Sequence, residues 1–130
     1  MRQIQDAKQS VSQALPAAGA TNTSASMDFT QGGEAPETVE LEISVPALPS
    51  LADAKNATFT VEESDDDTTF AAAPWGPTVT LTGAGGAGAA AKSQRFRAPA
   101  SAKRYIRLSQ TVDAAGGDNT AQSGTLRMYF

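Results

Sequence analysis

The densest group of potentially reactive side chains is the acidic run Glu62-Glu63-Ser64-Asp65-Asp66-Asp67. Several neighbouring carboxylates are what a hard cation such as calcium requires, and a pair of carboxylates is the equipment of a glycoside hydrolase. The run lacks the alternating acid spacing and central glycine of an EF-hand loop. Adjacent acids also give no reason to expect two carboxylates facing each other across a cleft. We therefore interpret the run as a solvated turn between two strands and assign no metal to it.

The chain contains neither histidine nor cysteine. It therefore has no imidazole general base, no thiolate nucleophile, no disulfide and no histidine-ligated metal. The glycine-rich residues 83–91 lack the Gly-Lys junction before a helix that a phosphate-binding loop needs, and are expected to form a flexible surface loop. Carboxylate and lysine chemistry remain possible in principle. These absences predict a protein that is not an enzyme and that binds no cofactor.

The charges are split along the sequence. Residues 28–67 hold eleven acids and one base, whereas residues 92–107 hold six bases and no acid. With Phe96 and Tyr105, the basic stretch could bind single-stranded nucleic acid by stacking. The alternatives are pairing of opposite charges on neighbouring strands, and pairing between the acidic face of one subunit and the basic face of another. Both are favoured over nucleic acid because the net charge is −4.

Alternation of apolar and polar residues with a period of two is the clearest structural signal. In residues 39–45 it places Val39, Leu41, Ile43 and Val45 on one face and two glutamates on the other. The same pattern marks residues 57–62, 78–82, 104–112 and 125–130, with weaker versions in 26–30, 68–72 and 93–97. Glycine and proline breaks separate these segments. They predict an all-β, jelly-roll-like β-sandwich of about eight antiparallel strands.

The N-terminal residues do not follow this pattern. Residues 1–25 are polar, with sparse apolar positions at Ile4, Val11 and Leu15, a spacing that fits a weak helical stripe and equally an extended arm. We assign residues 1–25 to an N-terminal arm and residues 26–130 to a single β-sandwich domain, since 130 residues suffice for one core. No secretory signal or membrane-spanning segment is expected.

The chain's one tryptophan, Trp75, lies between two prolines in Pro74-Trp75-Gly76-Pro77. It is interpreted either as an exposed binding anchor or as a cap on one end of the core, and the sequence does not choose between them. A β-sandwich that binds carbohydrate without catalysis is an alternative function, with Trp75, Phe96 or Tyr105 as a stacking platform. An aromatic content of 6% argues against it.

In the order and spacing of its segments, the chain resembles the capsid cement, or decoration, proteins of tailed bacteriophages. The resemblance covers most of the chain without one diagnostic motif, and it rests on the polar residues 5–9 and 21–23 and on residues 41–45, 57–66, 104–108 and 123–126. It implies a jelly roll without catalytic activity that binds the outside of an assembled phage head and bridges major capsid subunits.

The resemblance also implies the partners and the location. The partners would be the major capsid protein and further copies of the chain, with a homodimer favoured over a homotrimer, and neither nucleic acid nor membrane. The protein would reside on the capsid surface of the virion, and in the host cytoplasm during assembly. From the arm, the proline-framed loop and the basic stretch, we expect the interface to include Ile4, Val11, Leu15, Trp75, Arg95, Arg97, Arg104 and Arg107.

Overall fold

The computed structural model describes residues 5–28 and 39–129, with side chains from residue 10 onward in the first range. These residues form ten strands joined by turns and loops, and none of them belongs to a helix that could span a membrane. The strands are β1 (Gln5–Ala14), β2 (Thr21–Thr23), β3 (Met27–Asp28), β4 (Glu40–Val45), β5 (Asn56–Ser64), β6 (Ala71–Ala72), β7 (Val79–Thr82), β8 (Lys92–Arg97), β9 (Tyr105–Val112) and β10 (Ser123–Tyr129).

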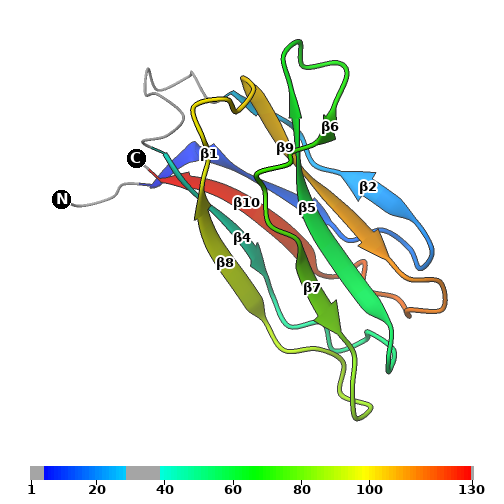
Figure 1. The fold of residues 1–130 in the computed structure, drawn as a ribbon. Coiled ribbons are helices and arrows are strands. Elements are labelled where there is room, and N and C mark those ends of the chain that lie inside the picture. The colour runs from blue at the N-terminus through cyan, green and yellow to red at the C-terminus, as the bar shows by residue number, and fades with distance from the viewer. Residues whose placement is uncertain (1–4, 29–38, 130) are drawn as a thin grey trace.

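The strands form two antiparallel sheets packed face to face (Figure 1). One sheet has the order β1-β10-β4-β8, and the other has the order β2-β9-β5-β6, with β3 also paired to β9 and β7 to β5. If β2 and β3 count as one interrupted strand, and β6 and β7 as another, each sheet has four positions. The first half of the chain then pairs with the second half in reverse order, which is the jelly-roll arrangement. The predicted fold is confirmed.

The alternating segments form strands with the predicted faces. In β4 and β9, buried and half-buried positions alternate, and the buried side of β4 consists of Leu41, Ile43 and Val45. Phe59 from β5 and Leu126 from β10 meet them between the sheets, where both are fully buried. A shift of one residue would exchange these apolar side chains for the polar ones on the outer face, so the register is strongly determined.

The N-terminal residues are part of the sandwich, so the predicted arm is wrong for the residues that the structure describes. From Ser10 to Ala14, β1 pairs with β10, while β2 and β3 pair with β9. Leu15 lies in the core with 2% of its surface exposed. Backbone pairing with β10 and β9 places these residues, although their own apolar pattern is weak. Ile4 lies outside the described residues.

A buried glutamine joins this N-terminal region to the core. Gln110 occupies an inward position of β9 and is fully buried. Its side-chain Nε2 donates hydrogen bonds to the carbonyls of Gln13 and Ala14, at 3.2 Å each, and to Asn22 Oδ1 at 2.9 Å. Its Oε1 accepts a hydrogen bond from the Gly124 backbone N–H at 3.2 Å. One side chain therefore satisfies polar groups of β1, β2 and β10.

Gly124 leaves the space that Gln110 occupies. A Cβ at residue 124 would overlap Gln110 Oε1 and would lie 3.1 Å from Phe59 Cε2. The absence of a side chain at this position of β10 lets the amide of Gln110 cross between the two sheets.

The glycine-rich loop at residues 83–91 is joined to neighbouring segments near both of its ends, whereas a Cβ at Gly85 or Gly86 in its tip would meet no other atom within 4 Å. Leu48 and Ala89 exchange two backbone hydrogen bonds, of 2.8 and 3.0 Å. A Cβ at Gly88 would overlap the Leu48 carbonyl oxygen, and one at Gly83 would overlap that of Ala52. Glycines at these positions therefore allow the close approach of two loops.

We predict that Gln110→Leu lowers the free energy of unfolding by about 3 kcal/mol, because each buried polar group left without a partner costs about 1–3 kcal/mol. Urea denaturation measures the loss. Ser109→Ala, at the neighbouring outward position, is the matched control and should change stability by less than about 0.5 kcal/mol. Equal losses in the two variants would contradict the importance of the Gln110 contacts.

Candidate functional site

The outer face of the four-stranded sheet carries a grid of charged residues. Strand β4 lies between β8 and β10, and its register places Glu40 opposite Arg97 and Glu42 opposite Arg95 and Arg127. The Arg95 guanidinium lies 3.3 Å from Glu40 Oε1 and 3.5 Å from Glu42 Oε2. Arg97 and Glu40 are 3.6 Å apart, and Arg127 and Glu42 are 3.4 Å apart. Each glutamate thus contacts two arginines.

Tyr129 completes this grid. Its hydroxyl donates a hydrogen bond to Glu42 Oε1 at 3.0 Å, and the Arg95 guanidinium lies 4.4 Å from the centre of its ring. Burial and then the bond to Glu42 raise the pKa of Tyr129 above its ordinary value. The hydrogen bond to Glu40 likewise raises the pKa of Arg95.

The six-stranded sheet pairs its charges in the same way. Arg107 of β9 lies 2.7 Å from Glu62 of β5, and Arg104 lies 2.9 Å from Asp28 of β3. Together with the grid, these pairs join the acidic first half of the chain to the basic second half. Cross-strand pairing within one chain, one of the three interpretations of the charge split, is therefore confirmed for these residues.

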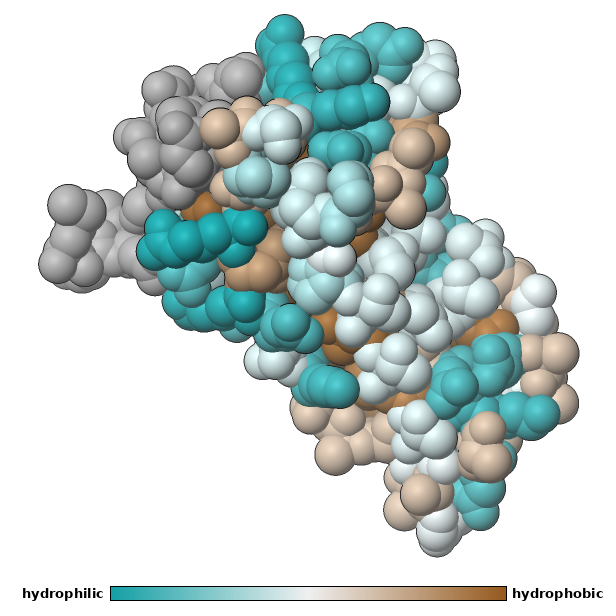
Figure 2. Space-filling model, viewed as in Figure 1, coloured by the Kyte–Doolittle hydropathy of each residue, from teal (hydrophilic) through white to brown (hydrophobic). Residues whose placement is uncertain are grey.

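Hydroxyl groups cover the uncharged part of both outer faces. Across the four-stranded sheet, Ser12, Thr125, Ser44 and Ser93 form one transverse row. Across the other sheet, Thr21, Thr111, Thr58 and Thr80 form a second row. Figure 2 shows broad pale areas of weakly polar residues between the strongly hydrophilic ones. The outer faces of both sheets are thus polar, with rows of small hydroxyl side chains beside the charged pairs.

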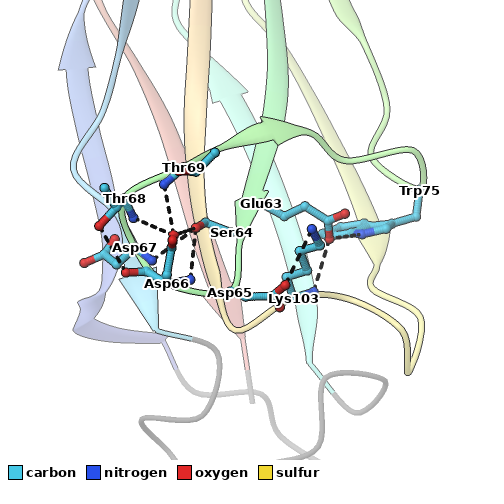
Figure 3. Close-up of polar contacts among 9 residues, drawn as sticks. All are labelled: Glu63, Ser64, Asp65, Asp66, Asp67, Thr68, Thr69, Trp75 and Lys103. Atoms are coloured by element: carbon cyan, nitrogen blue, oxygen red, sulfur yellow. Dashed lines mark hydrogen bonds and ion pairs between the residues drawn. The ribbon is translucent and has the colours of Figure 1, made fainter.

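Trp75 packs against the core, and Figure 3 shows its indole beside Glu63. Its indole N–H donates a hydrogen bond to Glu63 Oε1 at 2.9 Å, and its ring lies 6.1 Å from that of Phe96. Glu63 points inward from β5 and is 7% exposed, and the same oxygen accepts the Lys103 backbone N–H at 3.1 Å. The carboxylate therefore fixes two loops, and Trp75 acts as a cap while remaining half-exposed.

The three aromatic residues considered for carbohydrate stacking do not form one platform. Phe96 lies opposite the buried Leu41 on the inward side of β8, where Trp75 packs on it. Tyr105 lies on the outer face of β9, with the Arg104 guanidinium 5.0 Å from its ring centre.

The acidic turn, residues 65–69 after β5, is stabilised by hydrogen bonds among its own residues and Ser64 (Figure 3). Asp66 Oδ1 accepts the Ser64 hydroxyl at 2.8 Å and the backbone N–H groups of Thr68 and Thr69 at 2.9 Å each. These bonds lower the pKa of Asp66 to about 2, with that from Thr69 the strongest cause. No cluster of three or more potential metal-ligating side chains was found among the residues described.

The described surface has a small hollow at the β4–β8 pairing. It measures about 140 Å3, is open to solvent, and is lined by Ser44, Val45, Ala91, Lys92 and Ser93. Pockets for small molecules usually enclose about 300–1,000 Å3. The outer faces and the edges of the sheets, rather than this hollow, are therefore the candidate binding surfaces.

The predicted interface residues do not share one surface. Arg95 and Arg97 lie on the outer face of the four-stranded sheet, whereas Arg107 lies on that of the other sheet, with Arg104 just before β9. Val11 is half-buried, and Leu15 is unavailable to a partner because it is in the core.

Sequence reasoning missed the buried polar residues, among them Glu63 and Gln110. Both occupy inward positions of strands that otherwise alternate regularly. A polar residue at an apolar position of the alternation was the available signal.

We predict that the backbone amides of Thr68 and Thr69 titrate with a midpoint near pH 2. The pKa of Asp66 in the folded chain is about 2, below its ordinary value of 3.8. The hydrogen bonds that the Asp66 carboxylate accepts are therefore complete above pH 3.8 and are lost as the pH falls through about 2. Amide chemical shifts followed by NMR from pH 5 to pH 1.5 measure the midpoint. Asp66→Asn should abolish the titration, and a wild-type midpoint at 3.8 or above would contradict this account.

We predict that Arg95→Met lowers the free energy of unfolding by less than about 1 kcal/mol, because exposed ion pairs contribute little. Arg95 has 47% of its side chain exposed. Urea denaturation at low and high salt measures the effect, and the loss should shrink with salt because screening weakens the wild-type pairs. Gln94→Met, at an exposed position of the same strand, is the control. A larger loss that is independent of salt would contradict the ionic interpretation.

No protein-family model matches the chain, and no curated protein matches it in sequence. Among solved structures, the crystal structure of PBSX exported protein XepA is similar, with a TM-score of 0.55 and 14% sequence identity. The likeness covers 91% of this chain and 34% of that chain. At this identity the comparison supports the β-sandwich fold alone, and the present chain spans about one third of the length of XepA.

Proposed function

We propose that the protein is a non-enzymatic capsid decoration protein that binds the outside of a phage head and bridges neighbouring major capsid subunits. The observation that carries the proposal is the jelly roll itself. It presents two polar outer faces, and the open hollow beside Ser44 and Ser93 measures only about 140 Å3. Such a molecule is suited to binding through a surface rather than to enclosing a substrate.

Two comparisons support this role. The order of segments along the chain resembles that of tailed-phage cement proteins, for which a jelly roll is expected, and the chain folds as one. The similar structure, XepA, is a protein of the phage PBSX. That likeness favours a phage origin, although most of XepA has no counterpart here.

The internal contacts suit a protein that must resist mechanical force. Its cross-strand ion pairs, the buried Gln110 contacts and the paired backbones of Leu48 and Ala89 join segments distant in sequence. A rigid unit loses little conformational freedom on binding. Many modest contacts, repeated over a shell, then add up through multivalency. The partners under this proposal are the major capsid protein and a second copy of the chain, and the location is the capsid surface.

We predict that purified phage heads lacking the protein bind it until a fixed number of copies per major capsid subunit is reached. The temperature at which such heads release their DNA should then rise, because a ligand that binds only the assembled shell stabilises it. Co-sedimentation measures occupancy, and a DNA-binding dye measures release during heating. Binding to unassembled capsid subunits should be weaker, since bridging requires neighbours. Heads that bind none of the protein would refute the proposal.

A further inference from the structure

An exposed apolar strip, residues 70–77, follows the acidic turn at the edge of the six-stranded sheet. Its sequence is Phe-Ala-Ala-Ala-Pro-Trp-Gly-Pro, and its strand β6 is the last in the order of that sheet. Ala71, Ala72 and Pro74 are exposed, and Phe70, Trp75 and Pro77 are half-exposed. Other outward strand positions are mostly hydroxyl or charged residues, so this run of exposed apolar residues requires an explanation.

The strip is held in one conformation. The Ala73 N–H donates to the Val61 carbonyl at 2.9 Å, and the Gly76 N–H donates to the Ala73 carbonyl at 3.1 Å. The Trp75 indole N–H is bound to Glu63. Since the indole is the strip's one polar side-chain group, a covering partner would make mainly apolar contacts there. A tryptophan side chain that is already held in place, with exposed small residues around it, is typical of the centre of a protein interface.

Charged groups border the strip. The Arg107 guanidinium lies 4.0 Å from the centre of the Phe70 ring and pairs with Glu62. The turn before the strip carries three carboxylates, of Asp65, Asp66 and Asp67, against the one ammonium of Lys103, which is 3.6 Å from Asp65. An apolar centre with a polar rim is the usual composition of a protein interface. The excess of carboxylates on this rim complements a basic partner.

We propose that residues 70–77 and the acidic turn form a docking surface for a protein whose own apolar patch is bordered by Lys and Arg side chains. The inference rests on the proposed function, under which this partner is the outer surface of the major capsid subunit. A standard interface takes about 20–30 residues from each side, so the eight-residue strip is the centre of a larger contact.

A second copy of the chain complements this surface less well. Its net charge is −4, and Arg95, Arg97, Arg104 and Arg107 each already pair with a carboxylate of their own chain. Supplying a basic rim from these four arginines would therefore require breaking their pairs.

The test measures binding to phage heads that lack the protein, by co-sedimentation over a range of concentrations. Ala72→Arg places a long cation in the strip and should weaken binding about tenfold or more, as loss of an interface centre does. Ala121→Arg, at an exposed alanine in the loop between β9 and β10, is the matched control and should bind as the wild type does. Thermal unfolding of each variant confirms that it remains folded.

Asp67→Asn tests the charged border of the strip without introducing a larger side chain. It should weaken binding at low salt and make the affinity less dependent on salt, because one carboxylate no longer attracts the basic partner. This variant also keeps the proposal testable if Ala72→Arg fails to fold.

The outcomes separate the two proposals. If the wild type binds heads and Ala72→Arg binds equally well, the docking surface is refuted while the proposed function stands. Equal losses in Ala72→Arg and Ala121→Arg also refute it. If light scattering shows that Ala72→Arg breaks an oligomer while head binding is retained, the occupant is a second copy and the proposal is wrong. If wild-type protein does not bind heads at all, both proposals fall.

Discussion

The reverse-order pairing of the two halves of the chain is the constraint on which the rest of the structure depends. It places β4 between β8 and β10, and β9 against β2, β3 and β5. Acids of the first half, such as Glu40 and Glu62, therefore lie beside bases of the second half, Arg97 and Arg107. A charge distribution that is lopsided along the sequence becomes locally balanced on the folded surface, because antiparallel strands bring distant residues together.

Polar groups inside the sandwich add further contacts between segments that are distant in sequence. Gln110 connects β1 and β2 to the core from the C-terminal end of β9, and Glu63 connects the Trp75 loop to Lys103. Both side chains replace apolar ones at inward positions, and both are tolerated because donors and acceptors surround them. The sandwich thus fixes its first strands and one of its ends by specific bonds rather than by apolar packing alone.

These features connect the fold to the proposed role on a capsid. Charged side chains on both faces mostly engage partners of their own chain, as Arg95 does with Glu40 and Glu42. They make a stable surface but leave little unbalanced charge to hold a ligand. The strip around Trp75 differs, because its exposed side chains are apolar and its border carries an excess of carboxylates. The edge of the six-stranded sheet, rather than the broad basic stretch, is therefore the better candidate for contact with a shell.

The sequence by itself determined the strands and their faces, because a period of two is written directly in residues such as 39–45 and 104–112. It also indicated the glycine and proline breaks between the strands and the absence of imidazole and thiol chemistry. It could not show β1, since Ser10–Ala14 owes its place to pairing with β10. Nor could it choose a role for Trp75 or partners for the arginines. Only the tertiary structure decided these, because each depends on side chains that are brought together from opposite halves of the chain.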